Sequence, residues 1–171
     1  MVSLVIGGAA SGKSAFAEDL ILAAPSRPLI YAATMEPWGE EAQKRIARHR
    51  ALRAGKGFVT FEAPRAANLL EIPEGGAVLL ECLTTLTANE CFSVGFDGAE
   101  KRLLAGVEAL LRRCGDAVLV SGDLFSDGYT YPPETERYLS VLAAVNGELA
   151  LRADRVIEVC CSIPIFHKGE A

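Results

Sequence analysis

The sequence predicts a three-layer α/β fold in which a mainly parallel β-sheet lies between two layers of helices. Apolar runs of strand length alternate along the chain with stretches of helical spacing, which is the pattern of repeated βα units. Several of these runs are apolar throughout, as expected for strands buried on both faces of a parallel sheet. A glycine-rich segment between the first run and the first helical stretch is the third observation.

The alternation also predicts the individual elements. Strands are expected at residues 2–6, 29–33, 58–61, 78–80, 118–120 and 156–159, and helices at residues 15–24, 40–53, 66–72, 99–113 and 134–153. Residues 163–168 are expected to add a short edge strand, because Pro164 has no N–H to donate to a neighbouring strand. The threonines after residue 82 favour a helix start capped by Thr84 or Thr85 over a substrate contact.

The glycine-rich segment reads Gly-Gly-Ala-Ala-Ser-Gly-Lys-Ser and fits the P-loop pattern G-x-x-x-x-G-K-[ST]. Its glycines allow a tight turn whose N–H groups point at a phosphate, and the next helix directs its N-terminus at the same anion. Lys13 is expected to reach the β- and γ-phosphates, and the Ser14 hydroxyl to bind Mg²⁺. The expected phosphate-binding residues are Gly7, Gly8, Ala9, Ala10, Ser11, Gly12, Lys13 and Ser14.

Two acidic residues end buried runs and are candidates for the same metal. Glu81 follows Val-Leu-Leu, and an acid at this place in a P-loop protein holds Mg²⁺ directly or through water. The simpler alternative is a strand-end carboxylate that enters solvent. Asp123 ends a second run of the same shape and is the rival for the metal or for a catalytic base.

A basic cluster with a histidine inside it occupies residues 44–56. Its cations are Lys44, Arg45, Arg48, Arg50, Arg53 and Lys56. Many such runs are only a solvated helix face. The functional alternative is a polyphosphate patch, in which arginine forks bind phosphate oxygens and His49 acts as base or nucleophile.

Length and composition set limits on the protein. A chain of 171 residues that is 50% hydrophobic suits one compact domain spanning residues 1–171. The net charge of −5 argues against a nucleic-acid binder. No membrane span or signal peptide is expected, and the five cysteines are expected to be reduced, mostly buried thiols of a cytoplasmic protein.

These motifs resemble the bifunctional adenosylcobinamide kinase / adenosylcobinamide-phosphate guanylyltransferase family of cobalamin synthesis, over nearly the whole chain. The most specific segments are Arg-Ile-Ala-Arg-His-Arg at residues 45–50 and Leu-Leu-Glu-Cys-Leu-Thr-Thr at residues 79–85. The P-loop, Val145-Asn146, Ile163-Pro164 and Lys168-Gly169 add to the resemblance. The chain departs from the family at Ala10, where Arg is frequent, and at Gly122-Asp123, where Asn-Glu is frequent.

The resemblance implies two reactions on a RecA-like P-loop fold that forms a homotrimer. A nucleoside triphosphate, ATP or GTP, phosphorylates the aminopropanol hydroxyl of adenosylcobinamide. GTP then transfers GMP to a histidine, which maps to His49, and the phosphorylated cobinamide displaces it to form adenosylcobinamide-GDP. Lys13 is expected to be catalytic with His49. Mg²⁺ is the implied cofactor, and Arg45, Arg48, Arg50, Glu62 and Glu81 are the further nucleotide-binding candidates.

Two alternatives remain open from the sequence. A simple P-loop kinase of a small hydroxyl substrate would use Lys13, Ser14 and Glu81 and leave His49 chemically idle. A nucleotide-binding protein without transfer chemistry is favoured only by the Gly122-Asp123 departure.

Overall fold

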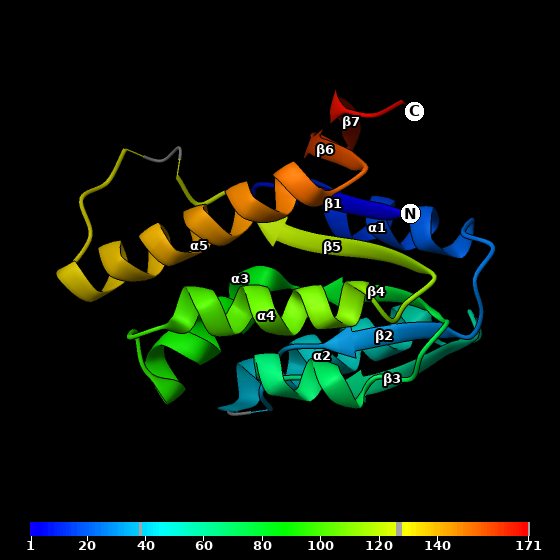
Figure 1. Ribbon diagram of the computed structural model, residues 1–171, viewed down its shortest axis with the longest axis horizontal. Coiled ribbons are helices and arrows are strands. Elements are labelled where there is room, and N and C mark those ends of the chain that lie inside the picture. The colour runs from blue at the N-terminus through cyan, green and yellow to red at the C-terminus, as the bar shows by residue number, and fades with distance from the viewer. Residues whose placement is uncertain (38, 126–127, 171) are drawn as a thin grey trace.

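A computed structural model describes residues 1–37, 39–125 and 128–170 of the chain, and its centre is one seven-stranded sheet (Figure 1). The strands are β1 (Val2–Gly7), β2 (Leu29–Ala33), β3 (Phe58–Glu62), β4 (Ala77–Glu81), β5 (Asp116–Gly122), β6 (Arg155–Cys160) and β7 (Ile163–Lys168). Their order in the sheet is β3-β2-β4-β5-β1-β6-β7. Every pairing is parallel except that of β6 with β7, so the predicted mainly parallel sheet and its edge strand are confirmed.

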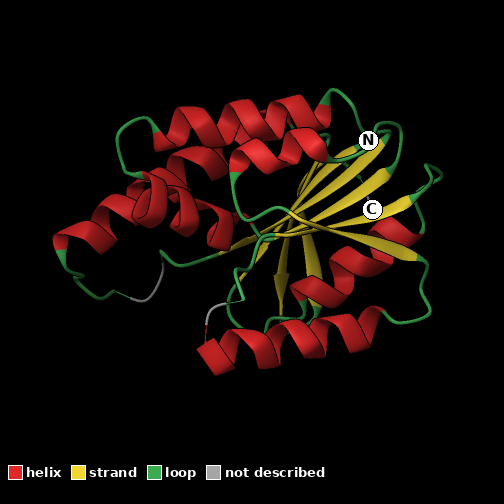
Figure 2. Cartoon of the chain, turned by 90° about the horizontal axis from the view of Figure 1, so that it is seen from below, coloured by secondary structure: helices red, strands yellow, loops and turns green. Residues whose placement is uncertain are grey.

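Helices cover both faces of this sheet, as the layered view in Figure 2 shows. One face carries α1 (Lys13–Leu22) and α2 (Gly39–Arg53); the other carries the 3₁₀-helix η1 (Ala66–Glu71), α3 (Leu83–Asn89), α4 (Ala99–Leu111) and α5 (Pro133–Arg152). A π-helical turn, η2 (Glu90–Val94), continues α3. The predicted three-layer fold is therefore confirmed.

Alternate side chains of each strand build two separate cores. In β1, Leu4 packs toward α4 and α5, whereas Val5 packs toward α1. Leu79 and Leu80 of β4 divide between the same two cores. Because successive strand residues point to opposite faces, strands that feed two cores must be apolar throughout, which is the pattern that the sequence shows.

The parallel register brings the carboxyl ends of the central strands to one edge of the sheet. Gly7, the last residue of β1, lies opposite Gly122, the last residue of β5. Glu81 ends β4 opposite Val120 of the same β5. Ligands of open α/β sheets gather at such an edge, so the fold places the P-loop, Glu81 and Asp123 around a common region.

The helix predicted at residues 66–72 is present as the 3₁₀-helix η1. Two other local predictions are wrong. The residue at the N-cap of α3 is Cys82, which makes no side-chain cap bond, and the Thr84 hydroxyl instead accepts the Gly122 N–H at 2.7 Å. The cysteines are not mostly buried: only Cys91 is fully buried, and Cys160 and Cys161 are exposed.

Within the described residues, no helix combines the length and the apolar character needed to cross a bilayer.

Candidate nucleotide and histidine site

The P-loop joins β1 to α1 and is packed against the turn between β6 and β7. Gly12 has a φ of 92°, a conformation that glycine adopts readily. A Cβ at this position would also lie 2.5 Å from the Ser162 hydroxyl oxygen. The Ser162 N–H donates to the Ser11 carbonyl oxygen at 2.8 Å. Glycine is thus required at residue 12 for two reasons, and the C-terminal hairpin helps to hold the loop.

Two polar side chains of the loop are positioned to meet a ligand. The Lys13 ammonium donates to the Gly8 carbonyl oxygen at 3.0 Å, so the side chain lies back over the loop. The Ser11 hydroxyl is buried and has no hydrogen-bond partner within the described residues. A buried polar group without a partner is unfavourable, and a bound phosphate is a ligand that would satisfy it.

The two family-specific segments meet at the Glu81 carboxylate. His49 lies on α2, and its Nδ1 is 3.8 Å from Glu81 Oε2, within ion-pair range for a charged imidazole. The same Oε2 accepts the Tyr31 hydroxyl at 3.0 Å. The side chain of Glu81 is only 11% exposed and that of His49 is 30% exposed, so the imidazole reaches solvent while its acidic neighbour is largely buried.

Tyr31 and Arg53 support this carboxylate from the sheet side. The Arg53 guanidinium stacks 3.3 Å from the centre of the Tyr31 ring, and both residues are buried. Burial, reinforced by the charge of Glu81, raises the pKa of Tyr31 well above its usual value. The phenol therefore stays protonated and donates a hydrogen bond to Glu81.

The remaining basic residues of α2 have separate environments. Arg50 Nη2 pairs with Glu62 Oε1 at 3.1 Å, which brings two predicted nucleotide-binding residues together. Arg48 is exposed on the helix. The side chain of Arg45 lies outside the described part of the structure. Lys56, just beyond α2, pairs with Glu18 of α1 and so connects the histidine helix to the P-loop helix.

A pocket of about 470 Å³ lies along α2, the helix that carries His49. Its walls come from the segment after β2, from one side of α2 and from the end of β3, and they include Met35, Ile46, Arg50, Glu62 and Pro64. Apolar walls with a few charged groups at the rim are typical of small-molecule sites. The predicted residues Arg50 and Glu62 therefore line a cavity along the helix that carries the histidine.

Asp123 follows β5 at the entrance to the P-loop. Its N–H donates to the Gly7 carbonyl oxygen at 3.0 Å, and its Oδ1 accepts the Phe125 N–H at 3.2 Å. Gly122 is buried, and a Cβ there would lie 3.0 Å from the Thr84 hydroxyl oxygen. Asp123 is thus close to the P-loop backbone, and one of its carboxylate oxygens accepts a hydrogen bond from the turn that follows it.

The sequence pattern gave no role to Tyr31 or Ser162, and it placed Arg53 in the basic cluster without indicating its contact with Tyr31. Two signals were available in the sequence: Tyr31 is the one polar-tipped residue in the strand Leu-Ile-Tyr-Ala-Ala, and Arg53 follows His49 by four residues, which places both on one helix face. No local pattern indicates that Ser162 contacts the P-loop, because 151 residues separate it from Ser11 and only the sheet brings them together.

The family model and the relatives that match this chain indicate the same family. Residues 3–166 match the family described as cobinamide kinase / cobinamide phosphate guanyltransferase. The bifunctional adenosylcobalamin biosynthesis protein CobU of Salmonella typhimurium is 30% identical over 98% of this chain and 100% of its own length. The bifunctional protein CobP of Pseudomonas aeruginosa is 33% identical over 99% of each chain.

Solved structures that align with this chain have much lower sequence identity to it than these relatives do. The RadB recombinase aligns with a TM-score of 0.47 and 15% identity over 92% of this chain and 73% of its own. The KaiC-like protein PH0186 of Pyrococcus horikoshii aligns with a TM-score of 0.49 and 12% identity over 92% of this chain and 71% of its own.

Proposed function

The chain belongs to the cobinamide kinase / cobinamide phosphate guanyltransferase family, and from this premise we propose that it carries out both reactions in one domain. It phosphorylates the hydroxyl arm of adenosylcobinamide with ATP or GTP. It then transfers GMP from GTP to the resulting phosphate through a GMP-histidine intermediate on His49. In line with the family resemblance, the working assembly is proposed to be a homotrimer.

The observation that carries this proposal is the contact between His49 and Glu81. A simple kinase has no use for a partly exposed imidazole beside a buried carboxylate, and α2 is the basic helix of an otherwise acidic protein. A carboxylate that faces one ring nitrogen holds the proton on that nitrogen and leaves the other as a nucleophile. Glu81 faces Nδ1, so Nε2 is the proposed attacking atom.

In the phosphorylation step, the P-loop holds the triphosphate. The acceptor hydroxyl oxygen attacks the γ-phosphorus, the bond from that phosphorus to the β–γ bridging oxygen breaks, and the nucleoside diphosphate leaves while the hydroxyl proton is released. Lys13 moves from the Gly8 carbonyl to the transferred group, where its charge offsets the developing negative charge. The Ser11 hydroxyl and the backbone N–H groups of the loop orient the phosphates.

In the guanylyl step, His49 Nε2 attacks the α-phosphorus of GTP, a P–N bond forms, and the bond to the pyrophosphate oxygen breaks. The ring is cationic in the resulting adduct, and the Glu81 carboxylate beside Nδ1 stabilises it. An oxygen of the acceptor phosphate then attacks the same phosphorus. The P–N bond breaks, and His49 returns to its neutral form as the product leaves.

The oxygen donors of this edge fit a magnesium ion. Mg²⁺ binds one or two protein oxygens together with substrate phosphates and does not need an all-protein cage. Ser14 and Glu81 provide a hydroxyl and a carboxylate, and Asp123 provides a second acid near Gly7. Within the described residues, no group of three or more histidine, cysteine or acidic side chains forms such a cage. The ion would offset phosphate charge.

Replacing Glu81 with glutamine is expected to raise the Mg²⁺ concentration that half-saturates the kinase step on the order of tenfold, because a neutral amide is a weaker ligand for a hard cation. A Mg²⁺ titration of cobinamide phosphorylation measures this shift, with Asp123→Asn measured in parallel. A shift in Asp123→Asn alone would transfer the metal role to Asp123.

Replacing Tyr31 with phenylalanine is expected to slow formation of the histidine adduct about tenfold, with the KM for GTP unchanged. The variant keeps the ring under Arg53 but removes the hydroxyl that orients Glu81, and one hydrogen bond to a charged group is worth about that factor. Single-turnover mass spectrometry gives the rate. Tyr138→Phe, which removes another largely buried phenol, is the matched control; equal slowing in both variants would indicate a general loss of packing.

The direct test of the proposed function is the intact mass of the protein after incubation with GTP and Mg²⁺, quenched in alkali because phosphoramidates are acid-labile. A gain equal to GMP, mapped to His49 and discharged by cobinamide phosphate, is the expected result. Without an adduct and without pyrophosphate release, the guanylyl half fails, and phosphorylation of cobinamide then decides whether a simple kinase remains.

A further inference from the structure

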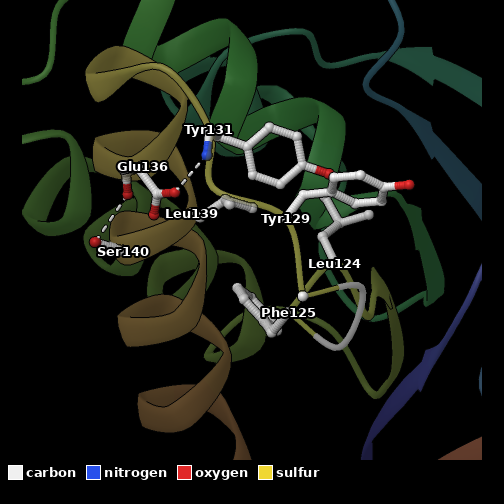
Figure 3. Close-up of a pocket in the computed structure, with 8 residues that line it drawn as sticks. Leu124, Phe125, Tyr129, Tyr131, Glu136, Leu139 and Ser140 are labelled. Carbon is white, nitrogen blue, oxygen red and sulfur yellow. Dashed lines mark hydrogen bonds between the residues drawn. The ribbon is translucent and has the colours of Figure 1, made fainter.

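A second pocket, with no arginine among the described residues that line it, lies between the segment that follows β5 and the first turns of α5 (Figure 3). Its volume is about 280 Å³. The side chains that form it include Leu124, Phe125, Tyr129, Tyr131, Glu136 and Leu139. Its walls are therefore mainly aromatic and aliphatic, with one carboxylate at the rim, and nothing in the two proposed phosphate-transfer steps accounts for them.

The pocket begins directly beside the P-loop. β5 ends at Gly122, in register with Gly7, and the Asp123 N–H donates to the Gly7 carbonyl oxygen at 3.0 Å. The first pocket residue, Leu124, is the next residue in the chain. A molecule held in the pocket would therefore lie next to the loop that is proposed to hold the γ-phosphate.

The side chains that line this pocket do not suit a nucleoside triphosphate. From Leu124 to Glu136 the sequence contains no lysine or arginine, whereas phosphate recognition relies on such cations. Apolar surface is exposed instead: Leu124 is 37%, Phe125 45% and Tyr129 76% exposed. Exposed aromatic rings near a transfer site are suited to the face of a large flat ligand.

The carboxylate at the rim complements an amide-bearing or cationic ligand. Glu136 Oε1 accepts the Tyr131 N–H at 2.8 Å, which fixes the side chain toward the pocket (Figure 3). An ionised carboxylate has about four acceptor sites, so one such bond leaves capacity for N–H donors of a ligand. A corrinoid has a flat macrocycle, a rim of primary amides and a cationic cobalt centre, and it matches each of these features.

Resting on the proposed function, we propose that this pocket is the corrinoid subsite and that it receives the edge of the macrocycle bearing the hydroxyl arm. A volume of about 280 Å³ holds an arm and its neighbouring amides but not a whole macrocycle. The rest of the ring would lie on Tyr129. The nucleotide and the corrinoid then approach the P-loop from opposite sides, the first along the basic helix α2 and the second along the start of α5.

The test uses Phe125→Ala and Tyr129→Ala in the full-length protein. Each is expected to raise the KM for cobinamide in the kinase step, and its dissociation constant in equilibrium dialysis, about tenfold. The KM for ATP and the rate of GMP-adduct formation, which needs no corrinoid, should stay unchanged. Leu151→Ala, which removes a side chain that is 75% exposed at the opposite end of α5, is the control and should match the wild type.

The outcomes separate this inference from the proposed function. If the wild type phosphorylates cobinamide and forms the GMP adduct, but both variants bind cobinamide as tightly as the wild type, the pocket assignment is wrong and the function stands. If the variants bind both ATP and cobinamide more weakly, the segment that follows β5 supports the P-loop and is not a corrinoid subsite. If the wild type neither binds nor phosphorylates cobinamide, both proposals fail.

Discussion

Replacing His49 with alanine or asparagine is expected to abolish the GMP adduct and the formation of adenosylcobinamide-GDP, while phosphorylation of cobinamide continues. The adduct requires a nucleophilic nitrogen, and neither replacement side chain provides one. His49 is 30% exposed at the surface of α2, so its loss should not disturb the core. Mass spectrometry after GTP treatment and a separate assay of γ-phosphate transfer measure the two halves independently.

The other histidine is a matched control for this experiment. The chain contains two histidines, and His167 lies on the edge strand β7, where its Nε2 is 2.9 Å from Glu158 Oε2. His167→Ala should accept GMP at the wild-type rate. A His49→Asn variant that still made adenosylcobinamide-GDP at a normal rate would refute the nucleophile assignment.

Replacing Lys13 with alanine is expected to slow the phosphorylation of cobinamide by about 10²-fold or more. The ammonium group is the cation that the P-loop motif provides for the transferring phosphate, and loss of one preorganised electrostatic contact has an effect of this size. In the structure the Lys13 ammonium donates to a backbone carbonyl oxygen of its own loop, so folding should be preserved without it. The rate of γ-phosphate transfer at saturating ATP is the measurement.

Lys101→Ala is the comparison for this change, because Lys101 is an exposed lysine of α4 outside the proposed site. It should keep full kinase activity and the same thermal unfolding midpoint as the wild type. Phosphorylation by Lys13→Ala at the rate of Lys101→Ala would contradict the catalytic role of the P-loop lysine.

The sequence alone was sufficient for the fold class and for most strands. Parallel strands buried on both faces must be apolar throughout, and they alternate with amphipathic helices, so a local pattern reports a layered architecture. The P-loop was identifiable for a related reason: its glycines, lysine and serine act within eight consecutive residues. Features whose cause is local can be read from local sequence.

Errors arose where a distant partner decides the local structure. The Thr84 hydroxyl was expected to cap α3 but bonds the Gly122 N–H of another strand. Cys160 and Cys161 were expected to be mostly buried like other thiols, yet they are exposed at the end of β6 and in the turn that follows it. The Thr84 bond depends on a strand that is remote in the chain, and the exposure of the two cysteines depends on the position of β6 and β7 at the edge of the sheet.

The sequence by itself determined the layered fold, the P-loop and the identity of His49 and Glu81 as the distinctive residues. Only the tertiary structure decided that Tyr31 and His49 meet at one oxygen of Glu81, that Ser162 holds the P-loop, and that aromatic residues after β5 form a pocket beside it. The physical reason is that each of these contacts depends on the order in which the strands pair. That order is set by packing of the whole chain and leaves no periodic signal in any one segment.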